Sequence, residues 1–187
     1  MDTPPSITDL LDAWAGGDPE ALNELMRVVY TKLREKARRA MAGERPTHTL
    51  SPTALVHEVY LELHRLKNVS FEGRGKFYAY VGVQMRTILR EHARTLHAKK
   101  RGAGAERVTL AESSLWAEPT PVDFLDLDAA LSELEGADPL LVRMIELRFF
   151  AGLTEDETAE ALGRSPSWVY REWKVAKRFL ADKLQPR

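Results

Sequence analysis

The stretch GLTEDETAEALGRSPSWVYREW, residues 152–173, carries the start and stop signals of two short helices joined by a sharp turn. Thr154 and Glu157 have the spacing of a capping box, in which each side chain binds the other residue's backbone N–H at a helix start. Gly163 stands where the turn favours a positive φ, and Ser165-Pro166 begins a second helix. Ala159 has the small side chain that a close approach of the two helices requires. The stretch predicts a helix-turn-helix.

The second helix of this unit separates an apolar face from a polar one. Apolar residues at helical spacing predict an inward stripe of Val169, Trp173, Ala176 and Leu180. The remaining residues are the candidate contacts with a DNA duplex: Arg164, Ser165, Ser167, Trp168, Arg171, Lys174 and Lys177. In the major groove an Arg can pair with guanine, and a Lys can hold a backbone phosphate. A plain helical hairpin that binds no DNA is the alternative interpretation.

Composition indicates a soluble protein and excludes several kinds of site. The chain has 187 residues, of which 44% are hydrophobic and 29% charged, and it contains no cysteine. Disulfides and thiolate zinc sites are therefore excluded, and we expect a cytoplasmic protein. No apolar run approaches the roughly 20 residues of a membrane span, so we expect no membrane insertion.

Enzymatic sites fail on spacing. His57 and His64 in HEVYLELH lie seven residues apart, whereas the zinc-protease motif places its two histidines at i and i+4. FEGRGK lacks the spacing of a P-loop, and no serine lies in a nucleophile-elbow pattern. We therefore expect no catalytic residue, no metal site and no cofactor.

Helix-start signals divide the chain into two parts. Residues 101–122 have no periodicity and are rich in Gly, Ala, Glu, Ser and Pro, which is typical of a linker. The predicted fold class is all-α, with small helical domains at 1–100 and 123–187 joined by this flexible linker. We expect helices after Ser6, Asp18 and Ser51 and over about residues 77–99, 123–135 and 139–151.

Charge is strongly segregated along the chain, although the net charge is only −1. Residues 74–101 contain eight Lys or Arg and one acid, and residues 164–178 contain five and one. These basic segments are either phosphate-binding surfaces or solvated helix faces. Between them, residues 102–142 contain nine acids and one base. We hypothesise that acids of this connector partly mask the DNA-binding surfaces of the free protein, namely Glu112, Glu118, Asp123 and Asp126; an ordinary solvated connector is the alternative.

Three stretches together resemble a known family. SPTALVHEVYLELHRL (51–66) and FEGRGKFYAYVGVQMRTILREHARTLHAKKR (71–101) resemble the second conserved region of bacterial sigma factors, the promoter-recognition subunits of RNA polymerase. RMIELRFFAGLTEDETAEALGRSPSWVYREWKVAKRFL (143–180) resembles the fourth region. The extracytoplasmic-function (ECF) group keeps only these two regions, joined by a linker. The resemblance covers about residues 7–100 and 123–184.

The resemblance implies a non-enzymatic sigma factor that binds core RNA polymerase and directs promoter-specific transcription initiation. Its helix-turn-helix would bind the minus-thirty-five element, and its first domain would capture melted minus-ten bases. The implied minus-ten set interleaves aromatic and basic residues, as single-strand binders do: Phe71, Arg74, Lys76, Tyr78, Tyr80, Arg86, Thr87, Arg90 and Arg94. The implied polymerase-binding set is Leu55, Glu58, Leu61 and Glu62. Implied partners are core polymerase and promoter DNA, with an anti-sigma protein as a further candidate.

Two other functions remain open at the level of sequence. A stand-alone helix-turn-helix regulator with a ligand-sensing first domain would bind its operator tightly without polymerase. A sigma-like interaction module would bind polymerase or an anti-sigma protein and give no transcript. For four residues of the second stretch, core packing is the prediction: Phe77, Val81, Met85 and Ile88.

Overall fold

The computed structural model describes residues 5–41, 50–66, 70–99, 107–109 and 121–184. Over these residues the fold is all-α, as predicted, apart from two strands of three residues each. The N-terminal half contains α1 (Ile7–Ala15), α2 (Pro19–Ala40), α3 (Pro52–Arg65) and α4 (Gly73–Lys99). The C-terminal half contains α5 (Phe124–Ala137), α6 (Pro139–Ile145), the π-helical turn η1 (Glu146–Phe150), α7 (Glu155–Leu162) and α8 (Pro166–Lys183).

The helix starts lie where the capping residues predict them. The Ser6 hydroxyl accepts a hydrogen bond from the Asp9 backbone N–H at 3.2 Å, which begins α1. Ser51 caps α3 in the same way, and the Asp138 carboxylate caps α6 by accepting from Leu141 N–H at 3.0 Å. Each hydroxyl or carboxylate pairs an N–H that the helix itself leaves without a partner.

Two elements differ from the expected helices. The long helix begins at Gly73, four residues before the predicted start at Phe77, so part of the Gly-rich loop forms the first turn of α4. Gly73 has a φ of 79°, which glycine adopts without steric cost. The expected helix over 139–151 is α-helical only to Ile145 and continues as η1.

The expected linker contains regular structure that the sequence analysis missed. β1 (Arg107–Thr109) pairs with β2 (Pro121–Asp123) in antiparallel register, with Val108 opposite Val122. Strands of three residues are too short to show the alternation that reveals a strand in sequence. The rest of the predicted linker lies outside the described residues, so its predicted flexibility remains a prediction.

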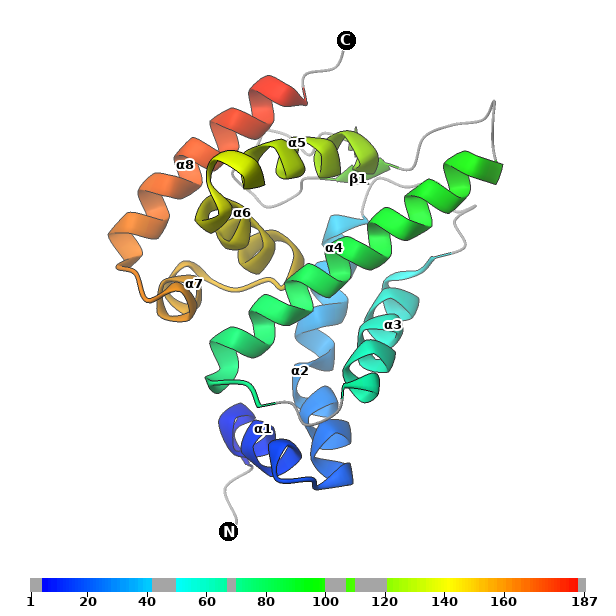
Figure 1. Ribbon diagram of the computed structural model, residues 1–187, viewed down its shortest axis with the longest axis vertical. Coiled ribbons are helices and arrows are strands. Elements are labelled where there is room, and N and C mark those ends of the chain that lie inside the picture. The colour runs from blue at the N-terminus through cyan, green and yellow to red at the C-terminus, as the bar shows by residue number, and fades with distance from the viewer. Residues whose placement is uncertain (1–4, 42–49, 67–69, 100–106, 110–120, 185–187) are drawn as a thin grey trace.

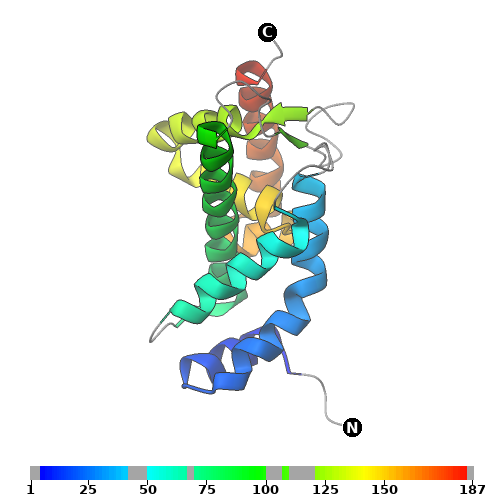
Figure 2. The same cartoon turned by 90° about the vertical axis from the view of Figure 1, so that its right-hand side faces the viewer.

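The two halves pack against each other along α4. Figure 1 shows α4 crossing the molecule diagonally, with α6, α7 and α8 on one side and α3 on the other. In Figure 2, α1 and the start of α2 lie at the lower end of the molecule, away from the C-terminal half. α4 contacts η1, α5 and α7, and one cluster of buried side chains extends through both halves. The predicted core residues Phe77, Val81 and Met85 are buried in it, and Ile88 packs against it.

Candidate nucleic-acid interface

The helix-turn-helix has the predicted geometry. The Thr154 hydroxyl accepts from the Glu157 backbone N–H at 3.3 Å, and the Glu157 carboxylate accepts from the Thr154 N–H at 2.7 Å. Gly163 ends α7 with a φ of 62°, and the Ser165 hydroxyl accepts from Trp168 N–H at 3.2 Å to begin α8. The residues predicted to face inward are all buried: Ala159, Val169, Trp173, Ala176 and Leu180. The two helices are therefore held rigidly by caps and core.

The outward face of α8 carries exposed positive charge. Arg171 and Lys174 are exposed, and the Lys174 ammonium lies 4.2 Å from the ring centroid of Tyr170. In the turn, the exposed Arg164 guanidinium lies 5.5 Å from the Trp168 ring. The other predicted contacts divide by exposure: Ser165 and Ser167 are exposed, whereas Trp168 and Lys177 are half-buried. Cations at the N-terminal part of this helix are suited to base edges and phosphates.

The sequence analysis missed three exposed residues of this helix: Tyr170, Val175 and Arg178. Tyr170 is 51% exposed and Val175 is 52% exposed, unusually high values for large hydrophobic side chains. The helical period could have found them, because none of the three falls on the inward stripe. An exposed apolar side chain beside Arg171 is suited to contact the methyl group of thymine.

The aromatic residues around the start of α4 pack on one another. The Phe71 ring centroid lies 5.9 Å from Trp14, 5.7 Å from Phe77 and 5.6 Å from Tyr80. Phe71 and Tyr80 remain half-buried, and burial raises the pKa of the Tyr80 hydroxyl. Only part of these two rings is accessible to a stacked base.

Tyr78 requires a correction, because its ring is buried in this conformation and offers no exposed stacking surface. It is 4% exposed, and the Lys32 ammonium lies 5.1 Å from its ring centroid. Lys32 also binds the Glu157 carboxylate of α7 at 2.7 Å. Burial, together with the nearby Glu157, raises the pKa of Tyr78 to about 12. The phenol therefore stays neutral at physiological pH.

Arg86 requires a second correction, because its guanidinium is buried and not on an exposed basic face. Its Nε donates to Asp128 Oδ1 at 2.9 Å, and its Nη1 donates to Glu146 Oε1 at 3.1 Å. Its Nη2 donates to the Ser132 hydroxyl at 3.1 Å. Burial raises the pKa of the Glu146 carboxyl, and the hydrogen bond from Arg86 offsets part of that rise. A cation from α4 and two acids from the C-terminal half thus share a buried site.

The remaining basic residues of the minus-ten set are more accessible. Lys76 and Arg94 are exposed, and Arg74 is exposed although it forms an ion pair with Glu160 of α7. Arg90 is half-buried, and its Nε is buried with no hydrogen-bond partner among the described residues. Thr87 is also half-buried.

A comparison with protein families identifies the chain. The model of the ECF sigma factor family matches residues 4–186, nearly the whole length. The chain belongs to the ECF sigma factor family. No curated protein and no solved structure matches it. Membership gives this ECF sigma factor a role in transcription initiation and places it in a family of non-enzymatic, DNA-binding transcription factors.

The residues that the resemblance assigns to polymerase binding divide between core and surface in this sigma factor. Leu55 is fully buried, which corrects its assignment as a surface contact: it packs in the core under α3. Glu58 and Leu61 are exposed, and the half-buried Glu62 pairs with Arg65. Beside them a hollow of about 480 Å³ between α2 and α3 is lined by Met26, Tyr30, Ser51, Thr53, Ala54, Val56, His57 and Tyr60.

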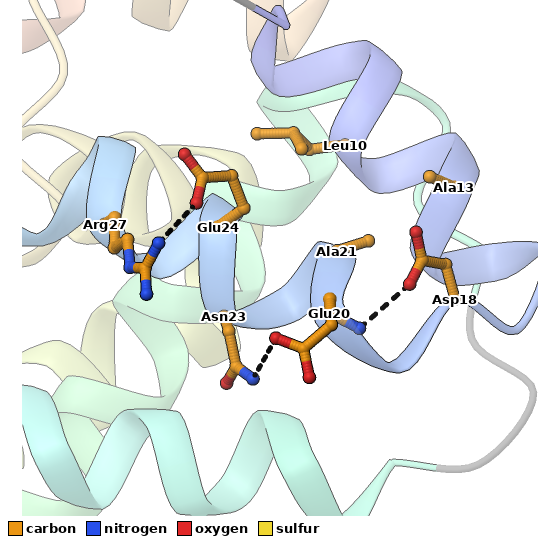
Figure 3. A pocket seen from close by; sticks show the side chains of 8 residues that line it. All are labelled: Leu10, Ala13, Asp18, Glu20, Ala21, Asn23, Glu24 and Arg27. Carbon is orange, nitrogen blue, oxygen red and sulfur yellow. Dashed lines mark hydrogen bonds and ion pairs between the residues drawn. The ribbon is translucent and has the colours of Figure 1, made fainter.

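A second hollow of about 300 Å³ lies between α1 and the start of α2 (Figure 3). Its charged residues pair locally: Glu24 binds Arg27 at 3.0 Å, and the Asp18 carboxylate accepts from the Glu20 backbone N–H at 2.9 Å. Within the described part of the chain, no three His, Cys, Asp or Glu side chains could hold a metal together. No described helix is both long and apolar enough to cross a bilayer.

Proposed function

We propose that this ECF sigma factor binds core RNA polymerase and directs initiation at promoters whose minus-thirty-five element is read by α8. The observation that supports this most is the exposed basic face of α8, with Arg171 and Lys174 beside Tyr170, on a rigid capped helix-turn-helix. Arg171 would contact a base edge, and Lys174 would contact a phosphate.

The N-terminal half would engage the minus-ten element through α4. Lys76 and Arg94 are exposed for phosphate contacts, and the accessible parts of Phe71 and Tyr80 are suited to stack with unpaired bases. Arg74 and Arg86 would join this surface only after release from their acidic partners in the C-terminal half.

Polymerase would dock on α2 and α3. Exposed Leu61 and Glu58 lie on α3, and the neighbouring hollow lined by Tyr30 and Tyr60 offers an apolar recess. A recess beside exposed acids suits a partner helix with apolar and basic residues. Such a partner would place this protein in the cytoplasm, together with polymerase.

The test is transcription in vitro with core polymerase on a genomic DNA library, followed by sequencing of the transcript starts. We expect starts that depend on this protein and share sequence about 10 and 35 base pairs upstream. An exposed pair of substitutions, Leu61→Ala with Glu58→Ala, should weaken polymerase binding without unfolding the chain, and Glu20→Ala on exposed α2 is the matched control. Tight binding to specific DNA without polymerase would instead indicate a stand-alone regulator. Polymerase binding with no transcript would indicate an interaction module.

A further inference from the structure

The contact between the halves joins cations of the N-terminal half to acids of the C-terminal half. Lys32 of α2 binds Glu157 of α7 at 2.7 Å, and Arg74 of α4 binds Glu160 of α7. Deeper in the contact, Arg86 binds two acids, Asp128 of α5 and Glu146 of η1. The halves are therefore complementary in charge along the length of α4.

Two glycines of α4 allow the backbones of the halves to approach closely. A Cβ on Gly82 would lie 2.8 Å from the backbone oxygen of Glu146, and one on Gly75 would lie 2.8 Å from the Cα of Ala161. Real Cβ atoms do not tolerate either distance, so any larger residue would force the halves apart. Glycine weakens a helix interior relative to alanine. Its presence at both contacts indicates that close packing matters here more than the stability of α4.

The packed arrangement is incompatible with binding both promoter elements at once. The minus-ten and minus-thirty-five elements lie about 25 base pairs apart, which at 3.4 Å per base pair is about 85 Å along a duplex. A compact chain of this length has a radius of gyration of only about 16 Å, and α7 of the helix-turn-helix packs directly on α4. The halves must separate before each can reach its element.

We propose that this closed packing is an autoinhibited state of the free protein, in which Asp128, Glu146 and Glu160 occupy the Arg86 and Arg74 cations that minus-ten DNA would bind. Carboxylates of the C-terminal half stand where phosphate oxygens would otherwise lie. Core polymerase holds the halves apart and frees these cations. The proposal rests on the proposed function.

The acids involved differ from those that the charge pattern suggested. Glu112 and Glu118 lie outside the described residues, and no side-chain placement is described for Asp123. Asp126 is exposed on α5, whereas Asp128, two residues later, is buried against Arg86. The masking acids in the structure thus come from α5, η1 and α7.

The first test measures closure in the free full-length protein. Since the chain has no cysteine, Asp12→Cys on α1 and Asp182→Cys on α8, both exposed, accept a fluorophore pair specifically. We expect high energy transfer in this labelled chain and a marked loss on Gly82→Ala with Gly75→Ala. Gly136→Ala, on α5 with open space around its Cβ, is the matched control and should leave transfer unchanged.

The same variants should change polymerase association. When only a small open fraction can bind, the apparent dissociation constant is raised by the inverse of that fraction. Opening the halves should therefore tighten core-polymerase binding by about tenfold or more, with no change for the Gly136→Ala control. Retained helical circular dichroism will establish that the glycine variants are folded.

A charge-reversal pair tests the contact without disturbing the core. Glu160→Lys should lower energy transfer, because it places a cation beside Arg74, and adding Arg74→Glu should restore it. Both side chains are partly exposed, so neither substitution threatens folding. Unchanged transfer in folded glycine variants and in Glu160→Lys would overturn the proposal. Because transfer is measured without polymerase, a wild-type protein that is closed yet fails to bind polymerase would refute the proposed function and leave closure established.

Discussion

Arg86→Ala should destabilise the whole chain far more than a surface substitution would. The Arg86 side chain is 6% exposed, and its partners Asp128 and Glu146 are 9% and 8% exposed. Removing the guanidinium leaves two buried carboxylates without their cation, and breaking such a buried pair typically costs about 3–5 kcal/mol. If Arg86 were an exposed basic residue, the same substitution would change the free energy of unfolding by less than about 0.5 kcal/mol.

The loss should depend on pH. Burial already raises the pKa of Glu146, with Glu135 raising it further and Arg143 opposing the rise; without Arg86 burial acts almost unopposed. A carboxyl whose folded-state pKa lies above its unfolded value favours the folded state at low pH, and this contribution is lost as the pH rises through the folded pKa. The deficit of Arg86→Ala should therefore be smaller at pH 5 than at pH 7.

The assay is urea unfolding followed by circular dichroism at both pH values, with linear extrapolation to water. A matched control, Arg86→Met with Asp128→Asn and Glu146→Gln, removes the cation and both charges together and should recover most of the lost stability. A loss below about 1 kcal/mol at pH 7 for Arg86→Ala would refute the inference that the ion pair is buried.

Three further predictions concern the helix-turn-helix and Tyr78. Arg171→Ala should weaken promoter binding by about 1–3 kcal/mol and relax preference at one base pair, while Lys174→Ala should weaken binding to all sequences and lower the salt slope by about one. Gly163→Ala should cost about 1 kcal/mol in urea unfolding, because its φ of 62° strains an alanine while the space around it is open. Tyr78, with its pKa of about 12, should ionise last among the tyrosines in an absorbance titration, and stability should fall as the pH rises above 10 toward 12, a loss that Tyr78→Phe reduces.

These predictions have distinct controls. Glu155→Ala, on α7 outside the outward face of α8, should leave sequence preference unchanged, and unchanged promoter binding in both Arg171 and Lys174 variants would remove α8 from the interface. Gly163→Asn should be milder than the alanine variant because asparagine tolerates positive φ better; equal stability of wild type and Gly163→Ala would contradict the strain. Ionisation of Tyr78 near pH 10 in folded protein would show that its ring is solvated.

Local sequence determined the helices and the helix-turn-helix. Hydroxyl and carboxylate caps, Pro at the first helical turn and Gly163 act over a few residues, so their effect is legible without the fold. The stripe of Val169, Trp173, Ala176 and Leu180 likewise follows from the helical period alone. The same reasoning could not locate β1 and β2, whose pairing depends on contact between residues far apart in the chain.

Only the tertiary structure decided which polar and aromatic residues are accessible. In sequence, Arg86 is one of a series with Arg90 and Arg94, but its partners lie 42 and 60 residues away in α5 and η1. Leu55 and Tyr78 look like neighbours of exposed residues, yet long-range packing buries both. Helical spacing gives the direction of a side chain relative to its own helix. What covers that face depends on which helices dock there, and burial and ion pairing follow from that docking.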